Sequence, residues 1–157
     1  NSVKQQDRLR NYKMKPGKII TEDDEIKRTL ENAKTIAIVG LSPKPERDSN
    51  KVAKYLKNQG YRIIPVRPGQ KEILGEKAHA TLDDIQEKVD IVDVFRNSAQ
   101  IVPHALEAAR LSPKVFWMQL NIENPEAAAL LTEAGVDVVT NKCIKIEHEK
   151  LCKKNAL

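Results

Sequence analysis

The sequence predicts an α/β domain of the doubly wound type, and three observations lead to it. From residue 35 onward, short apolar runs alternate with segments of helical periodicity. Continuous apolar runs are typical of parallel strands buried on both faces, and their alternation with helices implies right-handed βαβ crossovers. A length of 157 residues, 40% of them hydrophobic, suits one domain. We expect a five-stranded, mainly parallel sheet with helices on both faces. Numbered along the chain, its strands should lie in the order 3-2-1-4-5.

The first half of the domain is predicted to hold two helices and two strands. Residues 21–34 have helical periodicity, with Thr21 as the expected N-cap and acidic residues in the first turn, where they suit the helix dipole. The apolar run at 35–40 predicts the first strand, residues 50–60 a helix that ends at a glycine, and residues 61–66 the second strand.

In the second half, residues 81–85 predict a short helix or turn, and residues 90–95 the third strand. Residues 98–111 predict a helix with Pro103 in its first turn, because proline is poorly tolerated further in. Residues 114–120 predict the fourth strand.

The last helix of the sheet region has the clearest end signals. Asn124 suits the N-cap and Pro125 the first helical position, and Gly135 follows the predicted end. Residues 136–139 predict the fifth strand, and a polar, partly helical tail follows it.

The positive charge of the chain is concentrated near its beginning. Residues 1–18 carry six basic residues and one acidic residue, a net charge of +5, whereas the other 21 basic and 21 acidic residues cancel. We expect residues 1–20 to form a basic, flexible arm and residues 21–157 to form the folded domain. A basic arm can contact nucleic acid or an acidic partner. No nucleic-acid-binding motif and no aromatic residue beyond Tyr12 accompany it, so we do not expect nucleic acid as a partner.

Other functional signals are sparse. No apolar run approaches the ~20 residues that span a bilayer, and no apolar signal segment opens the chain, so we expect a cytoplasmic protein without membrane contact. Cys143 and Cys152 lack the spacing of a metal site and do not suggest a disulfide scaffold. His79, His104 and His148 are scattered, with no nearby nucleophile in sequence, so we assign no catalytic residue.

The segment from Gly40 to Ser49 follows the first strand, at the edge of the sheet where doubly wound folds bind their ligands. Gly40 allows a tight exit, Ser42 offers a hydroxyl group and Arg47 a bidentate partner to a phosphate, at the start of a helix that favours anions. The further glycines of a dinucleotide fingerprint are missing. The alternative is an ordinary βα turn in which Arg47 is solvated.

Two later positions bear on the ligand. Arg67 follows the second strand, where NAD-binding folds usually place an acidic residue on the ribose. An arginine there suits a phosphorylated ribose, either the 2′-phosphate of NADP or the 3′-phosphate of coenzyme A (CoA), unless it is simply a surface residue. Cys143 follows the fifth strand between Lys142 and Lys145, which would favour its thiolate; the alternative is a half-buried, inert thiol.

Five blocks of the sequence, in order, carry a resemblance to a known family: TIAIVGLSPKPERDSNKVAKYL, GYRIIPVRPGQKEILGEKAHATLDDI, VDIVDVFR, VFWMQLNI and NKCIKIEH. Together they resemble the small, single-domain CoA-binding proteins, which are similar to the N-terminal domain of the succinyl-CoA synthetase alpha subunit. The resemblance extends over residues 22–151. It implies a Rossmann-like fold that binds CoA along the strand ends, with no assigned reaction. The phosphorylated histidine of the synthetase belongs to a second domain, so the resemblance does not imply ligase activity.

The residues expected to bind the ligand all lie at strand ends or in the loops that follow them. They are Gly40, Leu41, Ser42, Pro43, Arg47, Ser49, Val66, Arg67, Pro68, Phe95, Arg96, Met118, Gln119 and Cys143. The chain departs from the family at Arg67, where asparagine is usual, and at Asn121, where glycine is common; Gln70 stands where the synthetase has a lysine.

We expect CoA or an acyl-CoA as the ligand of a binding module rather than of an enzyme. The alternatives are an NADP- or other nucleotide-dependent enzyme that uses the same cleft, and an interaction protein that uses its basic arm. A homodimer or another protein partner stays open.

Overall fold

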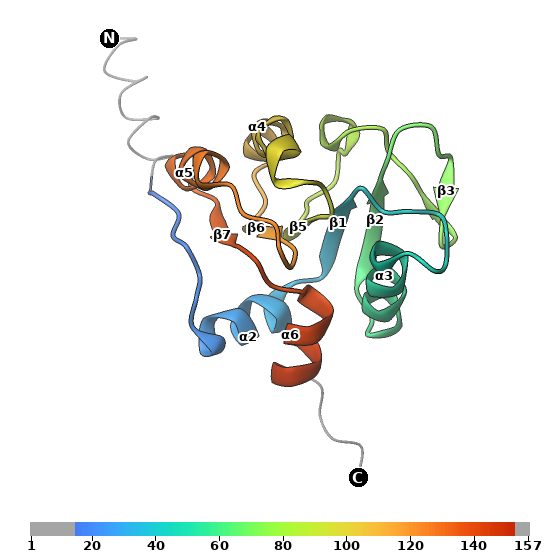
Figure 1. Ribbon diagram of the computed structural model, residues 1–157, viewed down its shortest axis with the longest axis horizontal. Helices are drawn as coiled ribbons and strands as arrows, with labels where there is room; N and C mark the ends of the chain where they lie inside the picture. Colours follow the sequence, from blue (N-terminus) through green and yellow to red (C-terminus); the bar gives the residue numbers. More distant parts are fainter. Residues whose placement is uncertain (1–14, 153–157) are drawn as a thin grey trace.

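A computed structural model describes residues 15–152 and confirms a Rossmann-like, doubly wound α/β fold. Its main sheet has five strands, and every neighbouring pair is parallel. The strands, which follow one another as expected from the apolar runs, are β1 (Thr35–Val39), β2 (Arg62–Val66), β5 (Ile91–Val94), β6 (Val115–Met118) and β7 (Asp137–Val139). Figure 1 shows the sheet in the middle of the molecule.

The strand order differs from the expected one. The sheet has the order β2-β1-β5-β6-β7, which is 2-1-3-4-5 when its strands are numbered along the chain, so the order 3-2-1-4-5 is wrong. After β2 the chain crosses back over β1, and Leu82, Ile85 and Val89 of this connection pack into the apolar cluster on the opposite face from α3. Both orders satisfy right-handed crossovers, and the alternation of strands and helices therefore does not distinguish them.

The connection from β2 to β5 holds elements that the sequence did not predict. A small antiparallel pair, β3 (Glu72–Ile73) and β4 (Glu76–Lys77), is followed by the one-turn 3₁₀ helix η1 (Leu82–Asp84), where residues 81–85 predicted a short helix or turn.

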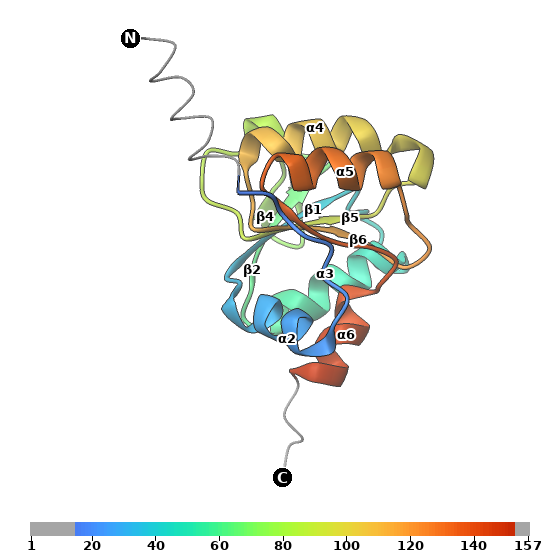
Figure 2. The same ribbon diagram turned by 90° about the vertical axis from the view of Figure 1, so that its left-hand side faces the viewer.

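Helices cover both faces of the sheet, as expected (Figure 2). One layer contains α2 (Asp23–Asn32), α3 (Asp48–Asn58) and α6 (Ile144–Leu151). The other contains α4 (Ile101–Leu111), preceded by a 3₁₀ turn at Ser98–Gln100, and α5 (Pro125–Glu133). Each face has its own apolar cluster, because alternate strand residues point to opposite sides. None of the helices in this part of the chain is long and apolar enough to cross a membrane.

The start of α5 agrees with the prediction from the sequence, whereas the predicted N-cap of α2 is off by one residue. The side chain of Asn124 caps α5 by accepting a 2.9 Å hydrogen bond from the N–H of Ala127, and Pro125 is its first residue, as predicted. Pro103 lies in the first turn of α4. At α2 the N-cap is Glu22 rather than Thr21, and no side chain caps that end within the described residues.

The described part of the expected arm lies against the domain. The N–H of Gly17 donates to the carbonyl oxygen of Thr132, the N–H of Ile20 to that of Val138, each at 2.8 Å, and the N–H of Val138 to Lys18 at 2.9 Å. Residues 17–20 therefore line the outer edge of β7 and are held there. Residues 1–14 lie outside the described part of the chain, so their flexibility stays a prediction.

Candidate functional site

A cleft of about 780 Å³ opens at the carboxyl ends of β5 and β6, between the start of α3 and α6. It lies next to the topological switch point of the sheet, between β1 and β5, where the strand order changes direction. The helix that follows β1, α3, covers one face of the sheet, whereas the helix that follows β5, α4, covers the other (Figure 2). Doubly wound folds bind ligands at this switch point. The cleft therefore occupies the place that the fold class predicts for a ligand.

Gly40 is the first residue after β1, and the close packing of the ends of β1, β2 and β5 requires a glycine at this position. Its φ is +80°, and its N–H donates to the carbonyl oxygen of Val66 at 2.9 Å. A Cβ at this position would clash with the carbonyl oxygen of Phe95, which follows β5. The glycine thus allows the chain to turn sharply where β1, β2 and β5 end.

The loop after Gly40 is held by its own side chains. The Oγ of Ser49 accepts a 3.0 Å hydrogen bond from the N–H of Ser42, and the side-chain amide of Asn50 donates to the Ser42 carbonyl oxygen at 2.8 Å. The Ser42 hydroxyl accepts from the N–H of Lys44 at 3.1 Å. Both serines, which were expected to bind the ligand, are buried and form hydrogen bonds within the loop.

The remaining loop residues divide between the core and the surface. Leu41 is fully buried, whereas Pro43 and Arg47 are exposed. Arg47 is the N-cap residue of α3, with an extended backbone and no capping hydrogen bond from its side chain. Its guanidinium group and the first N–H groups of α3 together favour an anion at this end of the helix.

Arg67, half-buried after β2, lies across the start of the same loop. One of its guanidinium nitrogens is 3.5 Å from the carbonyl oxygens of Gly40 and Leu41, at the long limit of a hydrogen bond. Its backbone N–H donates to His79 at 2.8 Å. Arg67 thus brings a positive charge next to the loop from Gly40 to Ser49. The residues on either side of it in the sequence differ in exposure, because Val66 is buried and Pro68 is exposed.

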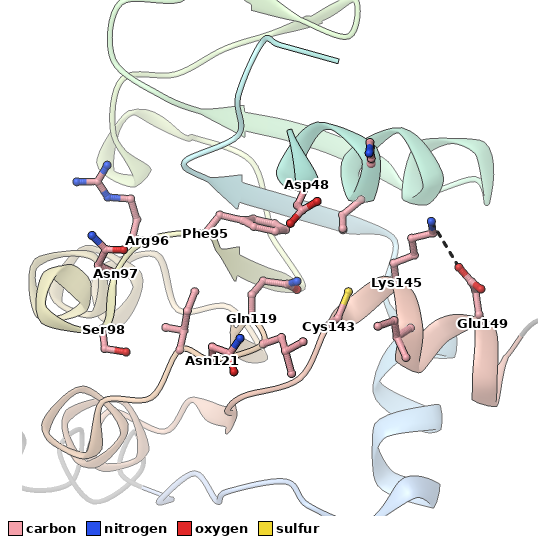
Figure 3. Close-up of a pocket in the computed structure, with 15 residues that line it drawn as sticks. Asp48, Phe95, Arg96, Asn97, Ser98, Gln119, Asn121, Cys143, Lys145 and Glu149 are labelled. Atoms are coloured by element: carbon pink, nitrogen blue, oxygen red, sulfur yellow. Dashed lines mark ion pairs between the residues drawn. The ribbon is translucent and has the colours of Figure 1, made fainter. Parts of the chain in front are cut away.

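Four of the expected ligand-binding residues line the cleft: Phe95, Arg96, Gln119 and Cys143. Figure 3 shows Phe95, Gln119 and Cys143 directed toward one space, whereas the guanidinium group of Arg96 points away from it. Gln119 is 5% exposed, and its Oε1 accepts a 3.1 Å hydrogen bond from the N–H of Ile144 at the start of α6. Cys143 is the N-cap residue of α6.

The sequence did not point to the helical walls of the cleft. Asp48 and Lys51 from α3 line it, as do Lys145 and Glu149 from α6, which form an ion pair of 3.7 Å. The spacing of four between Lys145 and Glu149 is the signal that could have identified this helix face. Asn121 also lines the cleft and has a φ of +68°. This left-handed conformation is the reason that glycine or asparagine suits the position.

The three histidines lie away from the cleft. The Nδ1 of His148 is 2.8 Å from the hydroxyl of Tyr55, and His104 pairs with Glu107 at 3.6 Å, where burial lowers the pKa of the imidazole. This arrangement agrees with their scattered positions in the sequence.

The carboxyl group of Asp93 is buried in the core. Asp93 of β5 is fully buried, between Ile38 and Trp117 of the neighbouring strands, and neither carboxyl oxygen has a hydrogen-bond partner among the described residues. Burial raises its pKa well above the usual range; the nearby N–H of Val94 opposes this without reaching hydrogen-bond geometry. The neutral form of Asp93 is therefore favoured.

Comparisons with known proteins show the family to which the chain belongs. A family model described as a CoA binding domain matches residues 34–149. The uncharacterized protein YneT of Bacillus subtilis is 44% identical over 124 residues, 79% of this chain and 92% of that protein. The solved structure of a hypothetical protein from Pyrococcus horikoshii has a TM-score of 0.82 at 41% identity and covers 85% of this chain and 94% of its own. The ADP-forming acetate–CoA ligase I of Archaeoglobus fulgidus is 32% identical over 74 residues, 47% of this chain and 11% of the ligase.

Proposed function

Because the chain belongs to the family of CoA binding domains, we propose that it binds CoA or an acyl-CoA along the carboxyl ends of its strands, as a module that catalyses no reaction by itself. The observation that carries the proposal is the extent of the family match. Residues 34–149 include the loop from Gly40 to Ser49, Arg67 and the residues that line the cleft.

The arrangement of charge supports one orientation of the ligand. Arg47 and Arg67 stand over β1 and β2, where they suit the phosphates of the nucleotide. The cleft lies over β5 and β6, further along the sheet. Neighbouring strands are about 4.8 Å apart, so β1 and β7, three spacings apart, are separated by about 14 Å. The pantetheine arm of CoA would cross this distance, which brings its thiol toward Cys143.

Arg67 also favours a second candidate function, because an arginine after the second strand suits the 2′-phosphate of NADP as well as the 3′-phosphate of CoA. Isothermal titration calorimetry with CoA, acetyl-CoA, NADP and NAD separates the two. We expect CoA and acetyl-CoA to bind and NAD to show no binding. Tighter binding of NADP than of CoA would overturn the proposal in favour of a nucleotide-dependent enzyme.

A further inference from the structure

Two exposed apolar side chains line the cleft from different elements. Leu120, after β6, and Ile146, on α6, are each 53% exposed, and both line the cleft beside Cys143. Large apolar side chains that stay exposed together in a concave site are typical of a binding surface. Two further exposed apolar residues of the described chain, Ile19 and Leu106, line no part of the cleft.

The surroundings of Leu120 and Ile146 extend this apolar surface. Ile122, partly buried after β6, and Val52 of α3 line the same cleft, as does the ring of Phe95. We call Leu120, Ile146, Ile122, Val52, Phe95 and Cys143 together the apolar end of the cleft. Apart from Val52 of α3, these residues follow β5, β6 or β7, whereas Arg67 follows β2 at one edge of the sheet.

The charged residues of the cleft do not favour an acidic group. Lys51 and Lys145 are accompanied by Asp48 and Glu149, and Lys145 is already paired with Glu149 at 3.7 Å. Arg96 is the third basic residue of the lining, but its guanidinium group points away from the cleft (Figure 3). A carboxylate placed here would meet two acidic side chains as well as two basic ones. An uncharged ligand group is therefore better matched to this end than a carboxylate.

We propose that the apolar end of the cleft binds an uncharged, apolar acyl chain, carried as a CoA thioester. The inference rests on the proposed function, since the nucleotide must bind near Arg47 and Arg67 for the thioester to reach Cys143. It goes further by naming the class of acyl group and the residues that select it. Leu120 and Ile146 contact the chain beyond the thioester sulfur.

The test compares CoA with butanoyl-, hexanoyl-, octanoyl- and succinyl-CoA by isothermal titration calorimetry. Each methylene that the cleft buries should tighten binding by up to about fourfold, so affinity should rise from CoA to hexanoyl-CoA. Succinyl-CoA, which matches butanoyl-CoA in chain length but ends in a carboxylate, should bind more weakly than butanoyl-CoA.

Three variants locate the effect. Leu120→Ser and Ile146→Ser change positions that are more than half exposed. Both should reduce the increase in affinity that the acyl chain gives over CoA, and leave the affinity for CoA itself within about twofold. Leu106→Ser is the matched control, because Leu106 is 45% exposed on α4 outside the cleft, and it should retain the full gain.

The possible failures are distinguishable. If neither CoA nor any acyl-CoA binds, the proposed function fails. If CoA binds but affinity does not rise with chain length, the inference about the acyl group fails alone. Tighter binding of succinyl-CoA than of butanoyl-CoA, or a gain that persists unchanged in both Leu120→Ser and Ile146→Ser, would likewise overturn it.

Discussion

The side chain of Gln119 joins the end of β6 to the start of α6: its Oε1 accepts a 3.1 Å hydrogen bond from the backbone N–H of Ile144. Gln119 and Cys143, the residue before Ile144, both line the cleft. The first N–H groups of a helix have no partner within the helix, so this bond satisfies one of them. Together with the 2.7 Å hydrogen bond from the Trp117 indole to the Lys142 carbonyl oxygen, it holds the start of α6 and Cys143 against the end of β6.

We expect Gln119→Leu to loosen the start of α6. The change leaves the N–H of Ile144 buried without a partner, which costs about 1–3 kcal/mol of the free energy of unfolding. Urea unfolding and hydrogen exchange of the α6 amides measure the effect. Gln119→Glu keeps an acceptor oxygen and should lose less, whereas Gln86→Leu, at an exposed position, should change neither measurement. Equal stability of Gln119→Leu and the parent protein would show that the bond is dispensable.

Gly40→Ala is expected to destabilise the fold because two effects act together. Gly40 has a φ of +80°, and a Cβ would clash with the carbonyl oxygen of Phe95. Gly69 provides the matched control: its φ is +81°, but nothing lies within 4 Å of the position of a Cβ. Both substitutions incur the cost of a left-handed backbone, about 1 kcal/mol or more. Only Gly40→Ala adds the clash, so urea unfolding should give it a clearly larger loss; equal losses would mean that the Phe95 carbonyl moves aside freely.

CoA should bind more tightly than dephospho-CoA if Arg67 contacts the 3′-phosphate. A charge-assisted contact that is well shielded contributes about 1.5–3 kcal/mol, roughly 10- to 100-fold in the dissociation constant. Calorimetry should therefore find that Arg67→Ala binds the two ligands equally. Arg47→Ala is the control, because the pyrophosphate is common to both ligands and their affinity ratio should stay unchanged. Retained discrimination in Arg67→Ala would assign the 3′-phosphate to other residues.

The parts of the fold that the sequence predicted are those with local causes. Asn124 and Pro125 form a complete helix start within a few residues, and α5 begins there. Strand order depends instead on where a long connection crosses the sheet, and nothing local encodes this. The segment after β7 had the sequence of a polar tail, although Ile144 of α6 is buried in the core and its neighbour Ile146 lines the cleft.

The candidate site shows a similar division. Strand-end position selected Gln119, which lines the cleft, but it also selected Met118, which does not. Successive strand residues point to opposite faces, and Met118 packs into the apolar cluster on the α4 and α5 side, away from the cleft. Ser42 and Ser49 were expected to bind the ligand because they lie in the loop that follows the first strand, yet each is part of hydrogen bonds within the loop. Such mutual engagement depends on the folded path of the loop.

Cys143 should form a mixed disulfide with oxidised CoA. In this exchange the Cys143 thiolate attacks one sulfur of the CoA disulfide, a new S–S bond forms, and one CoA leaves as a thiolate. Cys143 lines the cleft, whereas burial raises the pKa of Cys152, which lies outside it. Peptide mass spectrometry should therefore find the adduct at Cys143. The adduct should form more slowly in Arg47→Ala, because this variant is expected to bind oxidised CoA more weakly. Modification at Cys152 alone, or at neither cysteine, would contradict the expected position of the CoA thiol.

The buried carboxyl group of Asp93 should make stability fall as pH rises. Burial raises the pKa of Asp93 in the folded protein well above its usual range, whereas in the unfolded chain it is about 3.9. Between these two values the folded state binds the additional proton, so the free energy of unfolding decreases with pH, by up to about 1.4 kcal/mol per pH unit.

Asp93→Asn cannot titrate and should lack this decrease. Urea unfolding at several pH values between about 5 and 8 should therefore show the stability of Asp93→Asn rising relative to the parent protein. Asp24→Asn, an exposed control on α2, should follow the parent protein throughout this range. Parallel pH profiles for Asp93→Asn and the parent protein would mean that Asp93 is ionised in the folded state, and that its carboxylate must then have a partner that balances its charge.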